Sequence, residues 1–71
     1  MHDQGTQSAV MALVLAERET ILTLGDLMME IEGEDAVARA VRDLTAVGLL
    51  RREGESVLPT RAAIHFDRLP L

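Results

Sequence analysis

The sequence predicts a small, mainly α-helical domain with one antiparallel β-hairpin and elements in the order α-β-α-α-β-β-α. Three observations indicate this fold class. A stripe of apolar residues at a period of 3.6 runs through residues 34–47 and predicts an amphipathic helix. A glycine follows this helix at the position where a left-handed residue ends many helices. Two short segments then flank residues 53–55, a turn with glycine at its centre, as in a β-hairpin.

The first helix is expected to follow a disordered polar segment at residues 1–7. Ser8 is its predicted N-cap, and the helix continues to about Glu19. It is apolar on nearly all sides, which in so small a domain leaves part of its surface without an internal partner. We therefore predict a homodimer interface here; the alternative is that the alanines of this helix simply let its neighbours pack closely. The predicted interface residues are Val10, Met11, Val14 and Leu15.

A short strand and a second helix are expected next. Residues 20–24 alternate in polarity and include β-branched side chains, so they predict a short strand or an extended link. Thr23 and Asp26 have the spacing of a capping box, in which two side chains satisfy each other's backbone amides at a helix start. The second helix is predicted over residues 24–32, and Gly33 supplies the turn that follows. Its inward-facing residues are expected to be Leu24, Leu27, Met28 and Ile31.

The third helix and the hairpin have the clearest pattern in the chain. The helix is expected to begin near Glu34 or Asp35, whose carboxylates suit the positive end of a helix, and to end before Gly48. Its inward stripe is Val37, Ala40, Val41, Leu44 and Val47. The opposite, outward face carries Asp35, Ala38, Arg39, Arg42 and Ala46. The strands of the hairpin are predicted at residues 49–52 and 56–58.

A last helix is expected from its cap at Thr60 to about Leu69, where Pro70 stops it. Its predicted inner stripe is Ala62, Ala63, Phe66 and Leu69. Residues 1–71 are thus read as a single domain.

Composition excludes several classes of protein. The chain has 71 residues, 48% of them apolar but only one aromatic, and no cysteine, so a disulfide or thiolate metal site is excluded. No segment approaches the roughly 20 apolar residues of a membrane helix. Residues 9–16 lack the basic flank and cleavage site of a signal peptide. We expect a cytoplasmic protein with no membrane contact, no metal and no cofactor.

The charge is acidic overall and unevenly distributed. The net charge of -5 argues against general binding to nucleic acids or membranes. Residues 1–35 contain one arginine and eight acids, whereas residues 36–71 contain six arginines and four acids. All seven basic residues are arginine, which suits bidentate phosphate or base recognition and is also favoured in GC-rich genomes.

A family resemblance lies in residues 36–50, whose sequence is AVARAVRDLTAVGLL. This segment resembles the recognition helix of bacterial winged helix-turn-helix regulators of the MarR-, ArsR- and PadR-like kinds. Their shared pattern is a helix that ends in a leucine, then three residues, a glycine and two apolar residues. The positions of that pattern are held here by Leu44, Gly48, Leu49 and Leu50. The similarity extends over residues 8–69 and includes the capped helix start at Thr23 and the LPTRAA segment after the hairpin.

The resemblance implies a winged helix-turn-helix fold and a role as a DNA-binding transcriptional regulator. In this family the exposed face of the third helix enters the DNA major groove, which implies that Arg39 and Arg42 contact a guanine edge or a phosphate. The hairpin is the family's wing, and Arg51 and Arg52 are its expected contacts to the DNA backbone. Because strand residues alternate, only one of these two arginines is expected to face outward easily.

The alternative function is a winged-helix protein–protein interaction or dimerisation module that does not bind DNA. This alternative is favoured by acidic residues at the start of the third helix and in the turn of the hairpin, because carboxylates at these positions would repel DNA phosphates. A carboxylate can, however, accept a hydrogen bond from cytosine. These acids are Glu34, Asp35, Glu53 and Glu55. The alternative to DNA contact for Arg39 and Arg42 is that both are solvated charges and that Arg39 forms surface pairs with Asp43 and Asp35.

No arrangement of residues predicts catalysis, so we expect a non-enzyme. The sequence lacks a glycine-rich phosphate loop, a plausible triad and paired carboxylates in an apolar pocket. His65 shares a helix face with Arg61 and Arg68, which is either a phosphate-facing patch or an ordinary solvated face. Three acidic residues at four-residue spacing could provide ligands for a metal ion, but we interpret them as a like-charged, solvent-exposed face. They are Asp26, Glu30 and Glu34.

Overall fold

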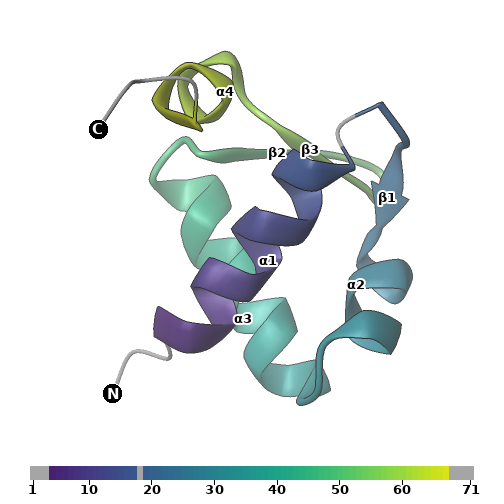
Figure 1. The fold of residues 1–71 in the computed structure, drawn as a ribbon. Coiled ribbons are helices and arrows are strands. Elements are labelled where there is room, and N and C mark those ends of the chain that lie inside the picture. The colour runs from purple at the N-terminus through teal and green to yellow at the C-terminus, as the bar shows by residue number, and fades with distance from the viewer. Residues whose placement is uncertain (1–3, 18, 68–71) are drawn as a thin grey trace.

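Helices surround a small antiparallel sheet in the computed structural model, which describes residues 4–17 and 19–67 (Figure 1). The elements are α1 (Gln4–Ala16), β1 (Leu22–Thr23), α2 (Leu24–Glu30), α3 (Glu34–Ala46), β2 (Leu50–Glu53), β3 (Ser56–Pro59) and α4 (Arg61–Asp67). The prediction of a mainly helical chain with a small antiparallel sheet, and of this order of elements, is confirmed.

The sheet joins parts of the chain that are far apart in sequence. Its strand order is β1-β3-β2, so β1 pairs with the second strand of the hairpin after two intervening helices. Val57 lies at the centre, opposite Leu22 on one side and Arg52 on the other. A backbone hydrogen bond of 3.0 Å from the amide of Leu24 to the carbonyl of Glu55 extends this pairing to the first residue of α2.

Helix α1 begins earlier and ends earlier than predicted. It starts at Gln4, so the structure has residues 4–7 in the helix where a disordered segment was predicted. Residues 1–3 lie outside the described part of the chain. Ser8 is an exposed residue inside the helix and not its N-cap. The physical reason is packing: Gln7 and Met11 lie beside Leu44 of α3, and such tertiary contacts sustain helical turns that propensity alone does not predict.

Helix α2 begins as predicted. The Thr23 hydroxyl accepts from the Asp26 amide at 3.1 Å, and the Asp26 carboxylate accepts from the Thr23 amide at 2.9 Å, so the capping box is confirmed. The helix ends at Glu30, two residues before the predicted end, because Ile31 is extended and its half-buried side chain packs against the core. Gly33 then adopts a φ of +91° and leads directly into α3.

Helix α3 and the hairpin largely follow the sequence pattern. Gly48 has a φ of +85°, as expected for the left-handed residue that follows a helix, and Gly54 has a φ of +63° in the hairpin turn. The strand β2 lies one residue later than predicted. Val47 was expected in the inward stripe, but it is 70% exposed because the helix ends at Ala46 and the chain turns there.

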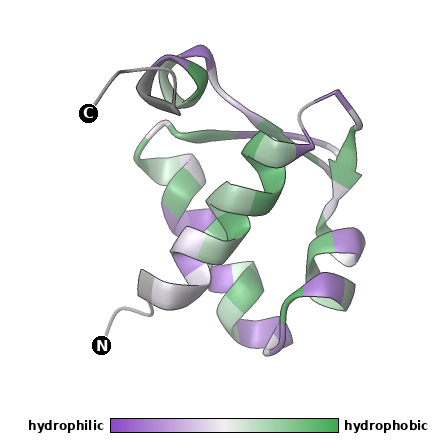
Figure 2. Ribbon diagram, in the orientation of Figure 1, coloured by the Kyte–Doolittle hydropathy of each residue, from purple (hydrophilic) through white to green (hydrophobic). Residues whose placement is uncertain are grey.

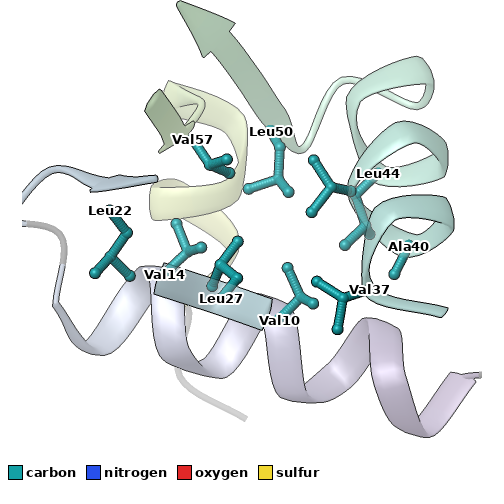
Figure 3. Close-up of a cluster of buried hydrophobic side chains, with 10 residues drawn as sticks. Val10, Val14, Leu22, Leu27, Val37, Ala40, Leu44, Leu50 and Val57 are labelled. Atoms are coloured by element: carbon teal, nitrogen blue, oxygen red, sulfur yellow. The ribbon is translucent and has the colours of Figure 1, made fainter. Parts of the chain in front are cut away.

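The core forms where α1, α3 and the sheet meet (Figure 3). Its buried residues are Val10, Val14, Leu22, Leu27, Val37, Ala40, Val41, Leu44, Leu50 and Val57. Figure 3 shows Val10 and Val14 pointing from α1 into this cluster, where they are 0% and 2% exposed. Their predicted place in a dimer interface is therefore wrong for this fold, because the chain's own core covers both side chains.

Thr60 connects the start of helix α4 to the turn after α3 through hydrogen bonds. The Thr60 hydroxyl accepts from the Ala63 amide at 3.2 Å, which confirms the predicted cap, and donates to the Gly48 carbonyl at 2.7 Å. Ala63 is buried as predicted, whereas Ala62 is exposed and does not belong to the inner face. The predicted positions of the Phe66 side chain, Leu69 and Pro70 lie outside what the structure describes.

Candidate nucleic-acid interface

The exposed face of α3 and the hairpin form the walls of one open groove of about 720 Å³. Its lining residues are Leu24, Asp35, Ala38, Arg39, Arg42, Thr45, Ala46 and Arg52. Six of these residues lie on α3 at successive turns, so the groove follows the length of the helix. Ala38 and Ala46 have small side chains, which lets a ligand approach the helix backbone closely.

Arg39 and Arg42 are exposed at the centre of the groove. Among the described residues, neither guanidinium forms an ion pair or a side-chain hydrogen bond. The pairing of Arg39 with Asp35 or Asp43, proposed for a solvated face, is therefore not formed. Both arginines keep all five of their donors for solvent or for a ligand.

The two arginines of β2 lie on opposite faces of the strand. Arg52 lies opposite the buried Val57 and lines the groove, and its Nη2 donates to the Gly54 carbonyl at 3.1 Å. Arg51 is not part of the groove lining; its Nη2 lies 3.1 Å from a carboxylate oxygen of Glu53. The side chains of this pair are 62% and 60% exposed, so the pair adds little to stability. Both arginines are exposed, but only Arg52 meets Arg39 and Arg42 across the groove.

Acidic residues lie at both ends of this surface. Glu34 and Asp35 are exposed in the first turn of α3, and Glu53 and Glu55 are exposed at the hairpin turn. Only Asp35 among them lines the groove. With three arginines and one aspartate, the groove itself is cationic although the chain carries a net charge of -5.

The sequence pattern identified most of this groove and missed two residues. The predicted outward face of α3 includes every lining residue of that helix except Thr45. Thr45 follows Arg42 by three residues, and this spacing places both on the same helix face. Thr45 already donates to the Val41 carbonyl at 2.7 Å. Leu24 was assigned to the inward face of α2, and no local signal places it beside the hairpin, because that contact depends on the pairing of β1 with β3.

Helix α1 presents a different kind of surface. It contains no charged residue, and Figure 2 shows its C-terminal half as predominantly hydrophobic. Met11 and Leu15, the remaining residues of the predicted interface, are half-buried, and Met11 borders a shallow hollow with Leu44. These two side chains therefore remain partly accessible to a second copy, unlike those of Val10 and Val14.

The other predicted clusters contribute no chemistry to the groove. Arg61 and His65 are exposed on α4, and Arg68 lies outside the described residues. Within residues 4–17 and 19–67, no group of three or more potential ligands is arranged to hold a metal ion. None of the helices in these ranges has both the length and the apolar character needed to cross a bilayer.

Comparisons of the chain with family models, with curated proteins and with solved structures found no match.

Proposed function

We propose that this chain is a winged helix-turn-helix DNA-binding protein that acts as a transcriptional regulator. In this proposal α2 and α3 are the helix pair, α3 enters the major groove, and the β2–β3 hairpin is the wing. The observation that carries the proposal is the groove itself, which Arg39, Arg42 and Arg52 line together and in which none of the three forms an ion pair with another described residue.

The dimensions of the surface suit this ligand. A B-DNA major groove is about 12 Å wide and admits one α-helix. The 13 residues of α3 are long enough to follow it over several base pairs, at a rise of about 1.5 Å per residue. Arg39 and Arg42 then reach a guanine edge or a phosphate, while Arg52 touches the backbone from the hairpin. Arg51 has no such role in this proposal, because it faces away and pairs with Glu53.

We further propose that the regulator is a homodimer formed through α1, with Met11 and Leu15 in the contact and a contribution from α4. A two-fold dimer would present two copies of α3 to half-sites about one helical turn, or about 34 Å, apart. The support is the uncharged character of α1 and the half-buried state of these two side chains.

Binding to short duplex DNA at low salt, followed by fluorescence anisotropy, tests the proposal. The informative variant is Arg39→Ala/Arg42→Ala. Its matched control is Arg51→Ala/Arg61→Ala, which changes the net charge equally and alters exposed residues outside the groove. If both groove arginines contact phosphates, the salt slope should fall by about 2 in the groove variant, since each lost contact contributes about 0.9. The control should retain most of the affinity and slope of the wild type.

Equal binding by the groove variant and its control would contradict the assignment of the groove. The second candidate function is an interaction module without DNA affinity, which is favoured by the exposed acids Glu34, Asp35, Glu53 and Glu55 around the groove. Failure of the wild-type chain to bind any duplex at low salt would favour that function. Binding with a steep salt dependence would exclude it.

A further inference from the structure

The groove contains one acidic side chain among its arginines. Asp35 is exposed in the first turn of α3 and lines the groove four residues before Arg39, so the two side chains lie on the same helix face. Its carboxylate has no ion pair or side-chain hydrogen bond within the described ranges. The adjacent Glu34 is equally exposed but does not line the groove. The free carboxylate of Asp35 thus faces the same space as the donors of Arg39 and Arg42.

A carboxylate in this position limits what the groove can bind. An ionised carboxylate only accepts hydrogen bonds, so it is repelled by phosphates and by the O6, N7 and O4 acceptors of guanine, adenine and thymine. In the major groove it can accept from an exposed amino group, and the N4 amino group of cytosine is the usual partner of an acidic side chain. Arginine has the complementary preference, because its paired donors match O6 and N7 of guanine.

We infer that Asp35 is the specificity-determining residue of the groove, and that it selects cytosine at one position beside a guanine read by Arg39. This inference rests on the proposed DNA-binding function and adds a sequence preference to it. Four residues correspond to about 6 Å along the helix, compared with about 3.4 Å per base step, so the two side chains reach bases one or two steps apart. The arginines supply attraction to any duplex, and Asp35 penalises duplexes that present an acceptor to it.

A structural role for Asp35 makes a different prediction. A carboxylate in the first turn also stabilises a helix through its interaction with the helix dipole. If that were its whole contribution, replacing it would change the stability of the fold and leave base preference untouched. Base preference therefore separates the two roles.

The test is selection of duplexes from a pool with a randomised central region, using the chain of residues 1–71. The wild type, the Asp35→Asn variant and the Glu34→Gln control are compared at one salt concentration, and far-ultraviolet circular dichroism verifies that each is folded. Glu34→Gln removes the same charge from the same helix turn but outside the groove. We expect the wild type and the control to select cytosine at one position. We expect Asp35→Asn to select adenine there, because the amide of asparagine pairs with N6 and N7 of adenine, with a change in preference of roughly tenfold or more.

Two results would overturn the inference while leaving DNA binding intact. One is an Asp35→Asn variant that binds all duplexes more tightly without a changed preference at any position, which would make Asp35 a repulsive charge only. The other is a wild type that retains duplexes without any base preference. A wild type that retains no duplex would overturn the proposed function together with this inference.

Discussion

Adding one methyl group at Gly25 and at Gly48 should change stability in opposite directions. Gly25 is the second residue of α2, and its φ is negative. A Cβ atom there would lie 3.7 Å from the Thr23 hydroxyl, an ordinary van der Waals contact. Gly48 has a φ of +85°, and a Cβ atom there would have no neighbouring atom within 4 Å. Neither substitution causes a collision, so backbone conformation alone decides the sign.

The magnitudes follow from these two conformations. Alanine at a compatible helical position stabilises by about 0.5–1 kcal/mol relative to glycine, because the unfolded chain loses freedom. An L-residue in the left-handed region costs about 1–2 kcal/mol. The two variants should therefore differ by about 1.5–3 kcal/mol in the free energy of unfolding. In a domain of this size, 1 kcal/mol corresponds to a change in Tm of about 4–8 °C.

Urea unfolding followed by circular dichroism measures the difference. Gly25→Ala should unfold at a higher urea concentration than the wild type and Gly48→Ala at a lower one, with the same m value because both unfold the same surface. Ala12→Gly, at an exposed position of α1, provides the baseline for helix propensity and should lose about 0.5–1 kcal/mol. A Gly48→Ala variant as stable as the wild type would refute the assignment of a strained left-handed residue to this turn.

Two further predictions concern the core and the assembly. Leu27→Ala removes a side chain that is 0% exposed, and it should lower the free energy of unfolding in urea by about 2–5 kcal/mol. Met29→Ala, at an 87% exposed position of the same helix, should stay within about 0.5 kcal/mol of the wild type. Equal losses of stability in the two variants would contradict the position of α2 in the core. Light scattering at high micromolar concentration should give a dimer for the wild type and a monomer for Met11→Glu, and a monomeric wild type would rule out the proposed dimer.

The parts of the fold that were predictable depend on local patterns. Helix α3 has a narrow apolar stripe, so the phase of the helix and its outward face, with Arg39 and Arg42, follow from spacing alone. The capping box at Thr23 and the left-handed Gly48 are also set within a few residues of the chain. These features were therefore confirmed with errors of only one or two residues at their ends.

The parts that were missed depend on contacts between distant segments. Helix α1 is apolar on nearly every side, so its sequence does not reveal which face packs on α3, and Val10 and Val14 were assigned to the wrong environment. The choice between Arg51 and Arg52 depends on the register of β2 with β3. The position of Leu24 in the groove depends on the pairing of Leu22 with a residue 35 positions later in the chain.

The hydrogen bond between the amide of Leu24 and the carbonyl of Glu55 has a mechanical consequence. Leu24 and Arg52 lie on walls of the same groove that belong to separate elements, and this bond joins those elements next to both residues. Together with the pairing of β1 and β3, this bond already holds the hairpin against the start of α2 in the free chain, so binding of a ligand does not have to form that contact. In the proposed DNA complex, a connection that already exists in the free chain would reduce the conformational entropy lost on binding.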